Sequence, residues 1–73
     1  MSSGDRRIDV DACLDDIQQN ADAVERYVAG VSADQFAMDE MRQDAVVRRL
    51  EIIGEAADRL IRAVRDQFGS PRR

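Results

Sequence analysis

The sequence contains no histidine and no tryptophan, and it has one cysteine and one proline among its 73 residues. Without histidine, these residues cannot supply the side chain that most often serves as an acid–base catalyst near neutral pH, or the commonest metal ligand. The lone thiol of Cys13 excludes a disulfide within the chain and a cysteine-rich metal site. We therefore predict no catalytic, metal-binding or cofactor-binding residues in this sequence.

Long apolar runs are also absent. No segment approaches the ~20 consecutive apolar residues that a helix needs to cross a bilayer, so no membrane contact is predicted. The first eleven residues, MSSGDRRIDVD, are polar and charged, unlike the apolar core of a secretory signal. The cytoplasm is therefore the expected location.

Lysine is missing as well, so all eleven basic residues are arginine, and fifteen acidic residues give a net charge of −4. The acidic side chains gather in the first half of the chain, at Asp9, Asp11, Asp15, Asp16, Asp22 and Glu25. Such a surface should repel a nucleic-acid backbone. Any surface that contacts RNA would have to lie in the second half, where the charges nearly balance.

Apolar residues recur at alternating spacings of four and three in two long segments, a pattern that predicts two amphipathic helices. In the first segment, about residues 8–29, the line is Val10, Leu14, Ile17, Ala21, Val24 and Val28. In the second, about residues 40–68, the line is Val46, Leu50, Ile53, Ala57, Leu60 and Val64. The chain is long enough for one small domain. We predict an all-α fold, an antiparallel helical hairpin forming the first half of an up-and-down four-helix bundle.

Residues that favour helix ends lie at the expected positions. Asp9 or Asp11 is placed to cap the first helix, and Gly30 to end it in a left-handed turn. Ser32 and Gln35 fit a capping box that would open a short helical turn at about residues 33–38. The hairpin is therefore expected to contain this short turn as its link.

The start of the second helix is expected near Glu40, with Asp39 as its cap. Met38 and Met41 lie on either side of that cap. Methionine is flexible and fills irregular gaps. We therefore predict that both methionines belong to the core.

The second helix has more apolar surface than a single partner helix can cover. Val47, Gly54, Ile61 and Phe68, spaced by seven, form another apolar line beside the first. A hairpin covers one line and exposes the other, and a large exposed apolar patch usually marks an interface. The predicted interface consists of Val47, Gly54, Ala57, Ile61 and Phe68. We expect a homodimer, or other helices, to complete a four-helix arrangement there.

Gly54 lies in the middle of this helix, where it costs roughly 1 kcal/mol relative to alanine. On a face that packs against other helices, the missing side chain would let two backbones approach closely. Ala56 and Ala57 keep the neighbouring surface thin. The alternative interpretation is a tolerated glycine that has no role in packing.

The segment QDAVVRRLEIIGEAADRL, residues 43–60, resembles the central helix of the HepT-like family of the HEPN superfamily. That helix has glutamine, alanine-valine and arginine before a core of leucine, glutamate, isoleucine, glycine, glutamate and alanine. Upstream, the helix ending in YVAG, followed by Ser32, Phe36 and Asp39, agrees with the family's order. The similarity extends over about residues 8–68.

The resemblance implies a HEPN-type bundle that dimerises, a metal-independent ribonuclease toxin, and a nucleotidyltransferase-type antitoxin that adenylylates a tyrosine. In the family, the catalytic signature is an arginine followed, after four to six residues, by a histidine. This sequence has no histidine, and its single tyrosine, Tyr27, lies in the first helix. It therefore resembles the front half of a HepT-like protein, with RNA expected as a partner of full-length relatives alone. Arg48 and Arg49 match the family's arginine region, where helix stabilisation, antitoxin contact and phosphate contact remain open.

Three functions follow from these observations. The first is a relative of the ribonuclease toxins that lacks the catalytic motif, is inactive alone, and acts through dimerisation or partner binding. The second is an active ribonuclease with an altered site, which an RNA cleavage assay would reveal. The third is a small helical interaction module unrelated to toxins. A neighbouring nucleotidyltransferase gene favours the first over the third.

Overall fold

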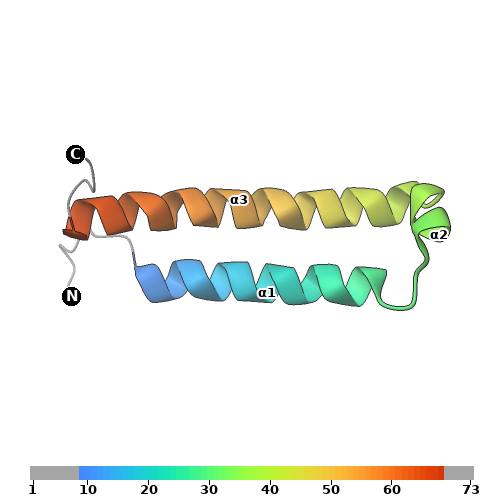
Figure 1. Cartoon of the computed structure of the whole chain (residues 1–73), viewed down its shortest axis with the longest axis horizontal. Helices are drawn as coiled ribbons and strands as arrows, with labels where there is room; N and C mark the ends of the chain where they lie inside the picture. Colours follow the sequence, from blue (N-terminus) through green and yellow to red (C-terminus); the bar gives the residue numbers. More distant parts are fainter. Residues whose placement is uncertain (1–8, 69–73) are drawn as a thin grey trace.

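A computed structural model describes residues 9–68, and within that range the chain forms three helices and no strand. These are α1 (Val10–Val28), α2 (Ala33–Ala37) and α3 (Glu40–Phe68). The two long helices lie side by side and run antiparallel, and α2 lies at the turn between them (Figure 1). The predicted all-α hairpin is therefore confirmed.

The helix ends are held by the expected side chains. Asp9 caps α1, with its carboxylate accepting a hydrogen bond from the Ala12 N–H at 3.3 Å. Gly30 has φ of 72°, the left-handed conformation that glycine adopts readily. Ser32 and Gln35 form the complete capping box of α2. The Gln35 N–H donates to the Ser32 hydroxyl at 3.1 Å, and the Ser32 N–H donates to the Gln35 side-chain oxygen at 2.9 Å. Local turn chemistry thus fixes how the chain reverses.

The seam between α1 and α3 consists of small and polar side chains. The buried apolar residues of the described chain are Cys13, Ala23, Val46, Ala56 and Ala63. Most seam residues are spaced by seven along each helix. They are Cys13, Asn20 and Tyr27 on α1, and Arg42, Arg49, Ala56 and Ala63 on α3. Because small side chains let helix axes approach closely, this seam holds the hairpin together with little apolar volume.

The predicted apolar lines do not face the partner helix in full. Leu14 and Val28 on α1, and Leu50 and Val64 on α3, are roughly half exposed. The prediction was wrong at these positions because the residue directly before each of them is the one that faces the partner helix. Cys13 comes before Leu14, and adjacent residues on a helix point about 100° apart.

Met38 and Met41 are also not in the core, contrary to the prediction. Their exposed fractions are 86% and 85%. The inside of the corner is occupied instead by the polar side chains of Arg42 and Gln43, which bond to backbone carbonyls there. The methionine side chains are consequently left on the outside of the turn.

Candidate functional site

One side of the hairpin carries a set of half-exposed apolar side chains, which we call the apolar face. Its members are Leu14, Val28, Val47, Leu50, Ile61 and Val64. Five of the six directly follow a residue of the seam, as Leu14 follows Cys13 and Val64 follows Ala63. The rotation away from the seam is therefore about 100° in the same sense on both helices. Since α1 and α3 are antiparallel, both rotations lead to the same side of the hairpin.

The residues of the predicted interface lie on or beside this face. Val47 and Ile61 are about half exposed and belong to it. Gly54 lies between them along α3, and a Cβ atom added there would meet no heavy atom within 4 Å. Ala57 is half-buried, and the side chain of Phe68 lies outside the described part. Their assignment to an interface stays a prediction.

Sequence reasoning missed that Leu14, Val28, Leu50 and Val64 share this face. These four were placed in the core of the hairpin instead. A signal was present in the sequence, because Cys13, Asn20 and Tyr27 are spaced by seven along α1. That line of small and polar residues, rather than the most apolar one, faces the other helix.

The centre of the seam contains a buried polar contact. Asn20 is 7% exposed, and its side-chain amide donates a hydrogen bond to the Asp16 carbonyl at 2.7 Å. Its side-chain oxygen accepts one from Arg49 at 2.9 Å. The Arg49 guanidinium also lies 3.4 Å from the Tyr27 hydroxyl. Because a buried amide is costly without partners, this contact fixes the register between the two helices.

A second polar contact joins the helices nearer the start of α1. The Arg59 guanidinium lies 3.5 Å from the Asp16 carboxylate, and both side chains are more than two-fifths exposed. An ion pair with this exposure contributes at most a modest stabilisation. It does report the register, since it shows that Asp16 and Arg59 lie at the same level of the hairpin.

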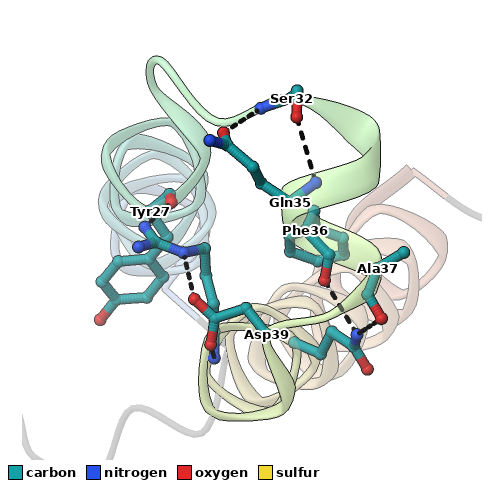
Figure 2. Close-up of polar contacts among 8 residues, drawn as sticks. Tyr27, Ser32, Gln35, Phe36, Ala37 and Asp39 are labelled. Carbon is teal, nitrogen blue, oxygen red and sulfur yellow. Dashed lines mark hydrogen bonds and ion pairs between the residues drawn. The ribbon is translucent and has the colours of Figure 1, made fainter.

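The corner beside α2 is held by consecutive residues at the start of α3 (Figure 2). Asp39 caps α3 by accepting from the Arg42 N–H at 3.0 Å. The Arg42 guanidinium donates to the Asp39 carboxylate and to the Tyr27 carbonyl near the end of α1. The Gln43 amide donates to the carbonyls of Phe36 and Ala37, each at 2.9 Å. Residues at the start of one helix thereby cap the ends of the other two.

The hydrogen bond from the Arg42 backbone N–H, followed by that from its side chain, lowers the pKa of Asp39 below its usual value of 3.8. Both bonds favour the ionised carboxylate. The Asp39 carboxylate is therefore charged throughout the neutral range and is available as a helix cap.

A shallow depression of about 350 Å³ lies against this corner, lined by Tyr27, Asp39, Met41, Arg42 and Ala45. Its charged groups are already engaged with each other, because Arg42 bonds to Asp39 and to the Tyr27 carbonyl. The depression therefore has an internally neutralised lining rather than a free cation or carboxylate for a ligand.

The described residues include no group of three or more side chains placed to hold a metal ion. Within residues 9–68, no helix combines the length and hydropathy required to cross a bilayer. Arg48 is exposed on α3, whereas Arg49 is used within the seam. Of the two arginines that match the family's arginine region, Arg49 thus has a role in holding the helices together.

Comparison with known proteins identifies relatives of this chain. The model of the family described as "Ribonuclease HepT-like" matches residues 17–73, more than three quarters of the chain. The Methanocaldococcus jannaschii protein named "Gamma-glutamylcyclotransferase and putative RNase MJ0434" is 37% identical over 62 residues, 85% of this chain and 28% of that protein. The chain thus spans less than a third of that relative's length. No solved structure matches this chain.

The matched region includes all of α2 and α3 and the greater part of α1, so it contains the corner and most of both the seam and the apolar face. The match agrees with the resemblance seen in residues 43–60. The chain belongs to the HepT-like ribonuclease family.

Proposed function

We propose that this chain is a component of a toxin–antitoxin system of the HepT type, and that its 73 residues act by binding other proteins rather than by cleaving RNA. Membership of the HepT-like ribonuclease family supports the first part. The second part follows from the absence of histidine, since the family's cleavage chemistry needs a histidine beside an arginine.

The use of the arginines supports the same conclusion. Arg49 donates to Asn20 at 2.9 Å, and Arg42 donates to Asp39 at 3.0 Å. An arginine that is engaged inside the hairpin is poorly placed to hold a phosphate. The acidic side chains of α1 add repulsion toward an RNA backbone.

The observation that carries the binding role is the apolar face. It extends over both long helices, and its six large side chains remain about half exposed in the isolated hairpin. A contiguous patch of this kind usually marks an interaction surface. The proposed partners are a second copy or other helices for the bundle, and a nucleotidyltransferase-type antitoxin for the system.

An RNA cleavage assay with the purified 73-residue chain tests the catalytic part. We expect no cleavage above a mock purification at any pH between about 5 and 9. A matched variant, Arg48→Ala, removes an exposed arginine and separates activity of this chain from contamination. Cleavage that survives purification and is lost in the variant would overturn the proposal.

Co-purification tests the binding part. The chain is co-expressed with a HepT-type nucleotidyltransferase antitoxin and with an unrelated helical protein as control. We expect the antitoxin alone to be retained. If both proteins are retained, or if neither is, the support for a toxin–antitoxin role is lost and a general interaction module remains.

A further inference from the structure

We propose that the shallow depression at the corner is a docking site for an acidic segment of another protein, which inserts an aromatic side chain and places carboxylates beside Arg26 and Arg48. The site lies on the side of the hairpin opposite the apolar face. It goes beyond the binding role proposed for that face and does not depend on what covers it.

The position of the depression follows from helix geometry. The residue directly after a seam residue belongs to the apolar face, so the residue directly before it points about 100° the other way. On the two helices these preceding residues are Ala12, Gln19, Arg26, Met41, Arg48, Glu55 and Arg62, and all seven are exposed. Because Met41 lines the depression, the depression opens on this second side of the hairpin.

The lining favours an uncharged aromatic group. Met41 is 85% exposed, so the hairpin itself leaves its thioether largely uncovered. A thioether makes favourable contacts with the edge of an aromatic ring, and the Tyr27 ring and the Arg42 guanidinium in the same lining can stack on its face. Since Arg42 is already paired with Asp39, a charged group would find no free partner inside. The inserted side chain is therefore aromatic and neutral.

The shape indicates a protein rather than a small molecule. Sites for free small molecules enclose most of the ligand's surface. The depression has a volume of about 350 Å³ but is shallow, so it covers one face of a side chain and leaves the rest outside. Aromatic side chains that fill such pockets are common anchors of protein–protein interfaces.

Two exposed arginines lie beside the depression, one on each long helix. Arg26 directly precedes Tyr27, and Arg48 directly precedes Arg49. The Arg49 guanidinium lies 3.4 Å from the Tyr27 hydroxyl, so the two preceding arginines lie at nearly the same level of the hairpin. Within residues 9–68, neither Arg26 nor Arg48 forms an ion pair.

Free cations at the rim favour a partner that carries carboxylates. Asp22 and Asp44 each precede one of these arginines by four residues, yet in the described part of the chain neither carboxylate pairs with it. The Asp22 carboxylate accepts a hydrogen bond from Gln18 instead, at 3.0 Å. The two guanidinium groups therefore remain available to an acidic segment.

Charge along the rest of α1 favours an acidic protein over RNA, although RNA also combines rings with anions. A strand of RNA carries a phosphate at every nucleotide, and on this chain of net charge −4 it would pass Asp15, Asp22 and Glu25. A protein segment needs carboxylates at two points alone. It can match the rim without meeting those acidic residues.

An array of short synthetic peptides tests the chemistry of the partner. Each peptide has tryptophan, phenylalanine, leucine or serine at its centre, flanked by acidic, basic or uncharged residues. The labelled 73-residue chain is applied to the array, with single-stranded RNA of mixed sequence as a further spot. We expect the strongest binding from peptides that combine an aromatic centre with acidic flanks.

Fluorescence anisotropy with the strongest acidic aromatic peptide then tests the site. Met41→Ser removes the thioether and should weaken binding by at least about tenfold. Met38→Ser is the matched control, because Met38 is 86% exposed but does not line the depression. Arg48→Gln should weaken binding by at least about threefold at low salt and less at high salt, whereas Arg65→Gln, at an exposed position near the end of α3, should not.

The proposal is overturned if no peptide binds, if basic or non-aromatic peptides bind best, or if RNA binds and the acidic peptides do not. Equal weakening by Met41→Ser and Met38→Ser, or by Arg48→Gln and Arg65→Gln, would overturn it as well. Circular dichroism confirms that each variant keeps its helices, as expected for exposed positions. The RNA cleavage and co-purification assays are separate measurements, so a failure here leaves the proposed function in place.

Discussion

At the scale of single residues, Asn20 and Arg49 form a buried polar contact between the two long helices. The Asn20 side chain is almost fully buried and satisfies both its donor and acceptor functions, one with the Asp16 carbonyl and one with Arg49. Neither group was singled out from the sequence for this contact. A polar residue in a line spaced by seven is easily taken for solvent-exposed, unless the opposite helix also carries a polar residue at the same level.

Replacing Asn20 with alanine should lower the free energy of unfolding by about 1–3 kcal/mol, because the Arg49 guanidinium loses a buried acceptor. Denaturant unfolding followed by circular dichroism measures the change. Gln19→Ala, at the adjacent exposed position of α1, is the matched control and should be close to neutral. If Asn20→Ala and Gln19→Ala have the same effect, the polar contact does not hold the seam.

At the scale of elements, the helix ends were predictable, whereas the face that each helix presents to its neighbour was not. Capping by Asp9, Ser32 and Asp39 depends on local geometry within four residues, so the sequence indicates it directly. The seam depends instead on contacts between residues that are distant in the sequence. Where large apolar residues point toward a centre shared by several helices, the line facing one neighbour can be small and polar.

The cap of α3 should respond to acid. The pKa of Asp39 is lowered in the folded chain, so its stabilisation is fully present above the usual value of 3.8 and is lost as the pH falls through the folded pKa. Wild type should therefore lose more stability between pH 5 and about pH 3 than Asp39→Asn, whose neutral amide still caps a helix. Denaturant midpoints at the two pH values provide the comparison. A constant difference between the two proteins would contradict this role.

The corner can be tested through Gln43, whose amide donates to two carbonyls at the end of α2. Gln43→Ala should cost about 1–2 kcal/mol of unfolding free energy, because those carbonyls lose their side-chain donor. Gln67→Ala, at an exposed position near the end of α3, serves as the control. Thermal unfolding of both variants at equal protein concentration is the measurement. Indistinguishable midpoints would show that α2 is held by its capping box alone.

At the scale of the whole molecule, the chain is less compact than a complete globule of its length. Its Cα radius of gyration is 16.4 Å, whereas a compact chain of this length would have about 11 Å. The sequence indicated the surplus of apolar surface on α3, through the line of Val47, Gly54 and Ile61. It did not indicate that α1 contributes Leu14 and Val28 to the same face, because this depends on how the two helices are rotated against each other.

Gly54 lies on the predicted interface, and if two copies associate there, alanine at this position should have opposite effects at low and high concentration. A Cβ there meets no atom of the hairpin within 4 Å, so Gly54→Ala should stabilise the monomer by up to about 1 kcal/mol through helix propensity. In the assembled bundle the same methyl group would hold two backbones apart and weaken association. Thermal melts at about 1 and 100 μM should therefore show a higher midpoint than wild type in the dilute sample and a lower one in the concentrated sample. A gain at both concentrations would mean that Gly54 is tolerated in α3 without a packing role.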